Sequence, residues 1–128
     1  MKKNVLVVED DEIIQKVLEW RLNTLGYTVC AKTATAEDAI VCAREKKPDI
    51  VLMDISLKGN TDGIEAAAAI KKMFQLPVVF LTASSREEDL ERAKMVQPDG
   101  FIVKPFNDTD IRVALKLALA NPEQNPPR

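Results

Sequence analysis

The sequence contains no histidine and only two cysteines, which limits the metal and redox sites that it can build. A structural zinc site takes about four ligands, mostly cysteine and histidine, and Cys30 and Cys42 alone do not supply them. Two cysteines in apolar surroundings are also too few for the disulfide framework of a small secreted domain. We therefore expect both side chains to be reduced thiols in or near the core.

Long apolar runs and clusters of basic residues are missing too. The apolar runs are far shorter than the ~18 residues of a membrane-spanning helix, and Met1-Lys2-Lys3 leads into a valine-rich stretch too short for a secretory signal peptide. A net charge of −2 without a basic cluster argues against nucleic acid as a direct ligand. We expect a cytoplasmic protein with no membrane segment.

What is present is an alternation of short apolar runs with longer amphipathic stretches, which is the rhythm of βα units. We expect strands near residues 4–9, 28–32, 49–54, 77–82 and 100–103, and helices near 12–25, 36–46, 63–74, 86–96 and 108–120. Two of the strands are apolar on both faces, as in a parallel sheet covered by helices on each side. The prediction is an α/β fold: a single doubly wound (βα)5 domain over residues 1–120, followed by an extended C-terminal tail or linker stump over 121–128.

Local signals support these boundaries. Thr35 and Asp62 stand where helix N-caps belong, and Gly26 follows the first helix, where a left-handed residue closes many helices. Pro48 and Pro77 each precede a predicted strand, at positions where a helix would not continue.

Polar side chains stand at the carboxyl ends of four predicted strands. Asp10 and Asp11 follow the first strand and Asp54 ends the third. Thr82 ends the fourth strand, and Lys104 follows the fifth. Parallel strands place these ends along one edge of the sheet, outside which such folds bind their ligands, so we expect the five side chains to meet there.

Three carboxylates held close together repel one another, and a divalent cation relieves that repulsion. Oxygen ligands without histidine or thiolate favour Mg²⁺. A carboxylate would then be the nucleophile, the amine a fixed positive charge and the hydroxyl a hydrogen-bond donor. This combination suits phosphoryl transfer, in which catalysis is mainly positioning and charge neutralisation.

The motifs VLVVEDDE, VLMDISL, DGIE, PVVFLTA and FIVKPF follow one another along the chain. In this order and at these spacings the sequence resembles the receiver domain of a two-component response regulator over nearly its whole length. The resemblance implies a flavodoxin-like sheet of order 2-1-3-4-5. It also implies a signalling switch rather than a conventional enzyme, with self-catalysed phosphorylation and dephosphorylation of an aspartate.

By position in these motifs, Asp54 resembles the phospho-accepting aspartate of the family. Asp10 and Asp11 resemble the acidic pair that holds Mg²⁺ directly or through water, with Asp54 and the backbone carbonyl of Ser56 as further ligands. Thr82 resembles the hydroxyl residue that binds the phosphoryl group.

The resemblance assigns the remaining switch residues in the same way. Lys104 is expected to bind the phosphoryl oxygens together with Thr82, and its bond to Pro105 is expected to be cis. Phe101 stands where the family has an aromatic side chain that moves inward when the hydroxyl residue shifts toward phosphate. The surface around the fourth helix, fifth strand and fifth helix is expected to change as a result.

The implied partners are a histidine kinase or histidine phosphotransfer protein as phosphoryl donor, since this chain has no histidine, and a downstream protein target or a separate effector domain. Two features depart from the family. The loop 55–63 is one residue longer than the commonest form and has Lys58 where proline is usual. The last helix lacks the charge pattern of the family's dimerising transcription factors, so the resemblance implies no oligomeric state.

Each assignment has a structural alternative. Asp10 or Asp11, taken singly, is more often a helix N-cap than a metal ligand. Thr82 alone would be read as β-branched strand filler, Lys104 as an exposed edge lysine, and Phe101 as a core residue.

Three other classes of protein share parts of the pattern. A flavin-binding electron carrier needs a phosphate cradle after its first strand, where this chain has Glu9-Asp10-Asp11. A haloacid-dehalogenase-like phosphatase needs a second acid two residues after its nucleophile, and that position is Ser56. A pseudo-receiver that acts only as a protein-binding module remains the alternative, although such domains usually lose one or more of the five residues.

Overall fold

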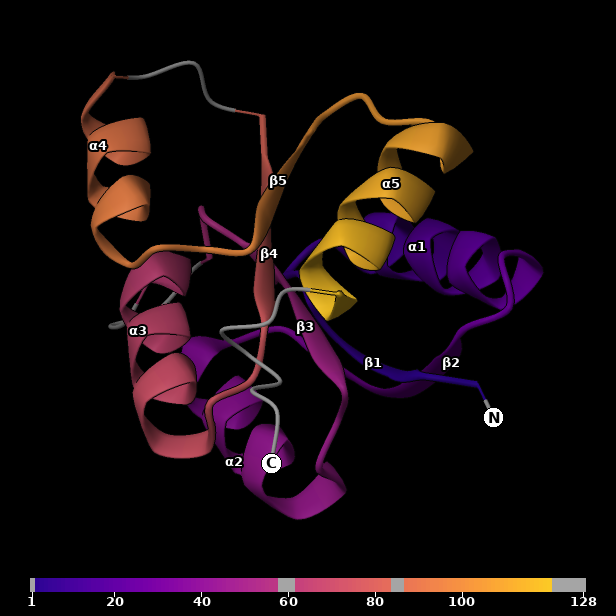
Figure 1. The fold of residues 1–128 in the computed structure, drawn as a ribbon, viewed down its shortest axis with the longest axis horizontal. Helices are drawn as coiled ribbons and strands as arrows, with labels where there is room; N and C mark the ends of the chain where they lie inside the picture. Colours follow the sequence, from indigo (N-terminus) through magenta and orange to yellow (C-terminus); the bar gives the residue numbers. More distant parts are fainter. Residues whose placement is uncertain (1, 58–61, 84–86, 121–128) are drawn as a thin grey trace.

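The computed structural model describes residues 2–57, 62–83 and 87–120, in which five strands alternate with five helices (Figure 1). The strands are β1 Asn4–Val8, β2 Thr28–Thr33, β3 Ile50–Asp54, β4 Val78–Thr82 and β5 Gly100–Val103. The helices are α1 Glu12–Thr24, α2 Ala36–Lys46, α3 Gly63–Phe74, α4 Glu87–Met95 and α5 Asp108–Leu119. The predicted tail over 121–128 and the atypical Lys58 lie outside the described residues.

The five strands form one sheet in the order β2-β1-β3-β4-β5, and each neighbouring pair is parallel. Helices α1 and α5 cover one face of this sheet, and α2, α3 and α4 lie on the other (Figure 1). The predicted α/β fold and its strand order are therefore confirmed. All carboxyl ends of the strands therefore lie along one edge, where the predicted site residues Asp10, Asp11, Asp54, Thr82 and Lys104 are expected to meet.

The two faces of the sheet carry two separate apolar clusters. Val5 and Val7 of β1 pack with Leu18 of α1 and with α5 on one face. Leu6 and Val8, which point the other way, pack with α2 and α3 on the opposite face. Because the central strands are buried on both faces, their sequences show continuous apolar runs rather than alternation.

The helix ends follow the predicted local signals. The Thr35 hydroxyl accepts a hydrogen bond from the Asp38 amide at 3.1 Å, and an Asp62 carboxylate oxygen accepts one from the Glu65 amide at 2.9 Å. Both residues are N-caps, as predicted. Gly26 has a φ of 95°, the left-handed conformation expected after the first helix.

One boundary differs in a way that matters for the site. The pairing of β1 with its neighbours ends at Val8, and the predicted strand had included residue 9. The Glu9 amide still donates to the Thr33 carbonyl at 2.9 Å, so the backbone continues along β2 for one residue while its side chain is already at the sheet edge. Glu9 is thus the first residue past β1.

The two cysteines are free and partly buried, and both pack against the cluster under α2 and α3. This agrees with the expectation of thiols near the core. Among the helices of the described segments, none has the length and apolar character that crossing a membrane requires.

Candidate functional site

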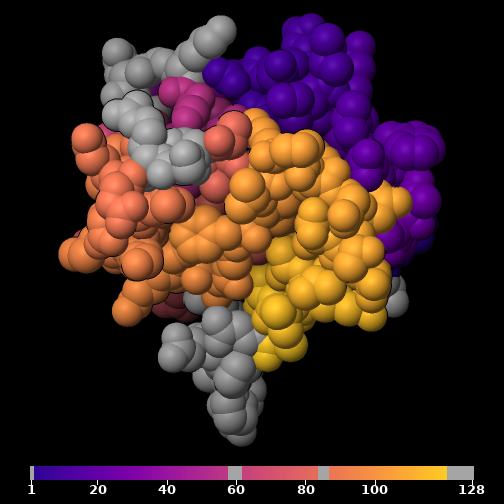
Figure 2. Space-filling view, turned by 90° about the horizontal axis from the view of Figure 1, so that it is seen from above, coloured from indigo at the N-terminus to yellow at the C-terminus, as the bar shows by residue number. Residues whose placement is uncertain are grey.

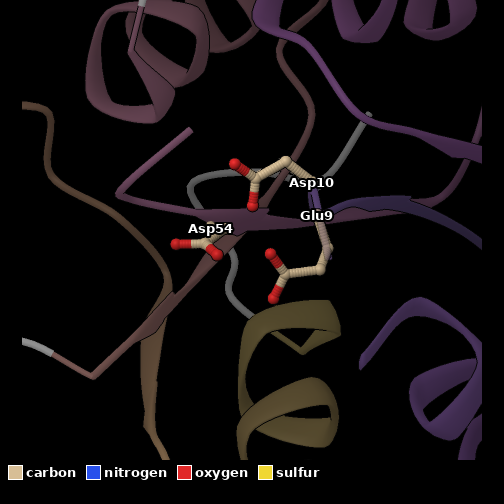
Figure 3. A group of neighbouring side chains, drawn as sticks. All are labelled: Glu9, Asp10 and Asp54. Carbon is tan, nitrogen blue, oxygen red and sulfur yellow. The ribbon is translucent and has the colours of Figure 1, made fainter. Parts of the chain in front are cut away.

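Three carboxylates meet at the edge of the sheet where β1 and β3 end. Glu9, Asp10 and Asp54 each place one carboxylate oxygen within 4.8 Å of the others (Figure 3). Glu9 and Asp54 are almost completely buried, whereas Asp10 is partly exposed. The prediction that carboxylates from separate strand ends gather at one edge is confirmed for Asp10 and Asp54.

Asp11 lies outside this group of three. Its Oδ1 accepts hydrogen bonds from the amides of Ile13 at 2.9 Å and Ile14 at 3.3 Å, so it caps the first turn of α1. The alternative that one of the two adjacent aspartates is an N-cap therefore holds for Asp11. Glu9 occupies the place in the cluster that the sequence analysis had given to Asp11.

Lys104 brings a positive charge to the carboxylates from the end of β5. Its Nζ donates to Glu9 Oε1 at 2.8 Å and to Asp54 Oδ2 at 3.1 Å. Its backbone amide donates to the Thr82 carbonyl at 2.8 Å, which fixes the residue beside the end of β4. The Lys104–Pro105 peptide bond is cis, as the family resemblance implied.

Burial and charge set the protonation of the two buried acids in opposite directions. The pKa of Glu9 is raised to about 7, mainly by burial and secondly by the neighbouring Asp54. Burial also acts to raise the pKa of Asp54, but hydrogen bonds from Glu9, the Ser56 amide and Lys104 outweigh it, so this pKa is lowered. Between the ordinary aspartate pKa of 3.8 and about pH 7 the pair therefore holds one proton, on Glu9, while Asp54 is ionised.

The backbone around Asp54 is held tightly. The Ser56 amide donates to Asp54 Oδ1 at 2.8 Å, which orients the carboxylate. Gly63, the first residue of α3, lies so close that an added Cβ would stand 1.9 Å from the Asp54 carbonyl oxygen. Gly63 belongs to the motif DGIE, but its role could not be predicted from the sequence, because a close approach of two backbones is a tertiary feature.

Thr82 is the buried last residue of β4, next to Leu81, which pairs with Asp54. It therefore lies at the same sheet edge as the carboxylates. A cavity of about 350 Å³ between α4 and β5 is lined by Thr82 and Phe101. Phe101 is 39% exposed as a residue, and its ring lies 5.9 Å, centroid to centroid, from the ring of the buried Phe80.

The model of the response regulator receiver domain family matches residues 5–116. The chain belongs to this family. The match runs from Val5 in β1 into α5, and it includes the carboxylate cluster, Thr82 and Lys104. Receiver domains are the signalling domains of two-component response regulators and are not conventional enzymes.

Similar proteins agree with this assignment. The transcriptional regulatory protein PdtaR of Mycobacterium tuberculosis is 34% identical over 92% of this chain. The match covers 57% of PdtaR, so the chain spans little more than half the length of that relative.

Two solved structures show the same fold. The signal receiver domain of a modulated diguanylate cyclase from Desulfovibrio desulfuricans is 36% identical, with a TM-score of 0.89, over 93% of this chain and 94% of that one. The Vibrio cholerae chemotaxis protein CheY4 is 26% identical, with a TM-score of 0.82, over 92% and 99% of the two chains.

Proposed function

We propose that this receiver domain is a phosphoryl-accepting switch and that Asp54 receives the phosphoryl group from a phosphohistidine of a histidine kinase or phosphotransfer protein. The observation that carries the proposal is the position of the buried Asp54 carboxylate: it has an oxygen within 4.8 Å of oxygens of Glu9 and Asp10, and its Oδ2 accepts from Lys104 Nζ at 3.1 Å. Burial acts to raise the pKa of Asp54, but Glu9 and Lys104 among its neighbours lower it. Such a carboxylate is a nucleophile whose surroundings already contain charges of both signs.

The three carboxylates suit Mg²⁺, because they are hard oxygen ligands at one point and the chain has no histidine. We propose that Glu9 and Asp10, rather than Asp10 and Asp11, form the acidic pair, with Asp54 and the Ser56 carbonyl as further ligands. A bound Mg²⁺ would supply the positive charge that offsets the repulsion between the acids and the phosphoryl oxygens.

The transfer balances without any further reactant. An Asp54 carboxylate oxygen forms a bond to phosphorus, the bond from phosphorus to the donor's imidazole nitrogen breaks, and its electron pair stays with that nitrogen. Lys104 and Thr82 bind the phosphoryl oxygens after transfer. Water attack on the same phosphorus, with Asp54 as leaving group, would return the domain to its starting state.

The output surface would be the face formed by α4, β5 and α5, which is continuous in Figure 2 and coloured orange to yellow. Helix α4 buries the single side chain of Ala93, so moving it breaks few apolar contacts. If Thr82 turns toward the phosphoryl group, Phe101 can enter the cavity that the two residues share. A downstream protein or effector domain would read this change.

Intact mass spectrometry after incubation with Mg²⁺ and acetyl phosphate tests the proposal. The wild-type chain should gain one phosphoryl group, which hydroxylamine should remove. Asp54→Asn should gain none, while Asp38→Asn, at an exposed position on α2, should behave as wild type. A wild-type chain that gains nothing under these conditions would favour the pseudo-receiver alternative.

A further inference from the structure

Gln15, in the first turns of α1, makes two hydrogen bonds that tie the helix to the edge of the sheet. Its side-chain Nε2 donates to the Glu9 carbonyl at 2.5 Å and to the Thr33 carbonyl at 3.0 Å. Side chains on a helix lean toward its N-terminus, which directs this amide back over the loop between β1 and α1. Both N–H groups of the amide can therefore be used, each on a carbonyl from a different strand end.

These bonds complete a set that holds the backbone of Glu9 on both sides. The Glu9 amide donates to the Thr33 carbonyl at 2.9 Å, and the Glu9 carbonyl accepts from Gln15. The Thr33 carbonyl thus accepts from both residues. One residue later the chain must turn into α1, where Asp11 is the N-cap.

The side chain of Glu9 needs such a support. It is 1% exposed and points toward Asp54 and Lys104, and its carboxylate shares the edge with two other acids. Repulsion among the acids acts to move Glu9 away, and the residue stands in a loop rather than in the ladder of β1. Lys104 holds the end of the side chain, and Gln15 holds the backbone from which it projects.

We propose that Gln15 is a positioning residue for the metal site, which keeps Glu9 aimed at Asp54 before any cation binds. The inference rests on the proposed function, since it requires that the three carboxylates bind Mg²⁺. Gln15 would not touch the cation. It would raise the affinity by removing the cost of ordering the loop between β1 and α1 at the moment of binding.

The test is the Mg²⁺ dissociation constant, measured by calorimetry with MgCl₂ and no phosphodonor. Gln15→Met keeps the length and helix preference of the side chain but has no N–H donor. We expect it to weaken Mg²⁺ binding by about tenfold, the lower end of what loss of an outer-shell partner costs. Lys16→Met is the matched control, because Lys16 is the exposed next residue of α1, and should bind as wild type.

Thermal unfolding in EDTA separates positioning from a general structural role. A merely structural residue would lower the melting temperature and leave the dissociation constant of the folded protein unchanged. If Gln15→Met does not fold, Gln15→Glu replaces it, because its carboxylate has no donor at neutral pH and faces the same two carbonyls. Binding within twofold of wild type by the folded variant overturns the inference and leaves the proposed function intact. Failure of the wild-type chain to bind Mg²⁺ overturns the proposed function instead.

Discussion

At the scale of single residues, the site depends on which acids project from the end of β1. The sequence shows four adjacent acids, Glu9 to Glu12, and residue type alone does not say which of them reach the site. The structure distinguishes them by position: Glu9 and Asp10 face Asp54, and Asp11 caps α1. What decides between these acids is that β1 ends at Val8, because the first residues past a parallel strand are those that reach the site.

Replacing Asp11 should therefore affect stability rather than metal binding. Asp11→Ala removes the N-cap of α1, and we expect a loss of about 1 kcal/mol in the free energy of unfolding, measured with urea. Mg²⁺ affinity should stay near the wild-type value. Asp10→Asn should show the opposite pattern, with weak Mg²⁺ binding and little loss of stability. A tenfold loss of Mg²⁺ affinity in Asp11→Ala would contradict this prediction and show that Asp11 belongs to the acidic pair.

The raised pKa of Glu9 predicts how stability depends on pH when no metal is bound. The folded protein holds a proton on Glu9 up to about pH 7, whereas the unfolded chain loses it near 4.5. Between these values the native state binds more protons, so the free energy of unfolding should fall as pH rises. The lowered pKa of Asp54 changes the stability only below its ordinary value of 3.8, and the raised pKa of Lys104 changes it only above 10.5. Neither group therefore contributes to the slope in this window.

Urea unfolding in EDTA at several pH values from 4.5 to 7.5 measures this slope. Glu9→Gln has no group that titrates at this position, and its curve should be flatter than that of wild type over the same range. If the two proteins show the same slope, burial of an ionisable Glu9 is not its cause.

At the scale of elements, buried acids also join neighbouring strands. The Asp99 side chain is 1% exposed, and its Oδ2 accepts hydrogen bonds from the Val78 amide and from Lys71 Nζ, each at 2.9 Å. These contacts link the start of β5 to the start of β4 and to α3. Because Lys71 is largely buried too, removing Asp99 leaves a buried charge without this partner.

We expect Asp99→Ala to lower the free energy of unfolding by about 3 kcal/mol or more, measured by urea denaturation. Glu91→Ala is the control, because Glu91 pairs with Lys94 on the exposed face of α4, and such pairs contribute at most about 1 kcal/mol. Similar small losses in the two variants would show that the Asp99 contacts add little.

Most of these elements could be predicted from the sequence, because local rules decide them. Apolar runs set the strands, and Thr35 and Asp62 set the starts of α2 and α3. The fit of Gly63 against the Asp54 backbone and the hydrogen bonds of Gln15 to two strand ends could not be predicted. Both depend on how closely a helix packs on the sheet edge, and no local sequence pattern determines the distance between a helix and a strand.

At the scale of the whole molecule, we expect a change at Asp54 to reach β5 and α4. A phosphoryl group adds roughly −1.5 to −2 charges at neutral pH, by analogy with phosphoserine, beside Lys104 and Thr82. Moving a population from about 1:99 to 99:1 needs about 5.5 kcal/mol of preference for the active state. Charge-assisted hydrogen bonds from Lys104 and Thr82, of about 1.5–3 kcal/mol each, would supply much of it.

Thr82→Ala should separate phosphorylation from its consequence. Asp54 should still accept the phosphoryl group, because the nucleophile and the acidic pair are unchanged. The response of β5 should shrink, because the variant lacks the hydroxyl that we expect to move toward the phosphoryl group. The measurement is the set of amide NMR shifts of residues 87–106 with beryllofluoride, a stand-in for the phosphoryl group, and Mg²⁺. Equal shifts in Thr82→Ala and wild type would mean that the hydroxyl does not transmit the signal.

The central claim is that occupancy of Asp54 changes the face formed by α4, β5 and α5. It is tested most directly by recording the same amide shifts in wild type and in Asp54→Asn, each with and without beryllofluoride and Mg²⁺. In wild type we expect shifts that begin around Asp54 and extend through Thr82 to Phe101 and α4. In Asp54→Asn we expect none beyond those caused by Mg²⁺. Shifts confined to the neighbours of Asp54, with β5 and α4 unchanged, would contradict it.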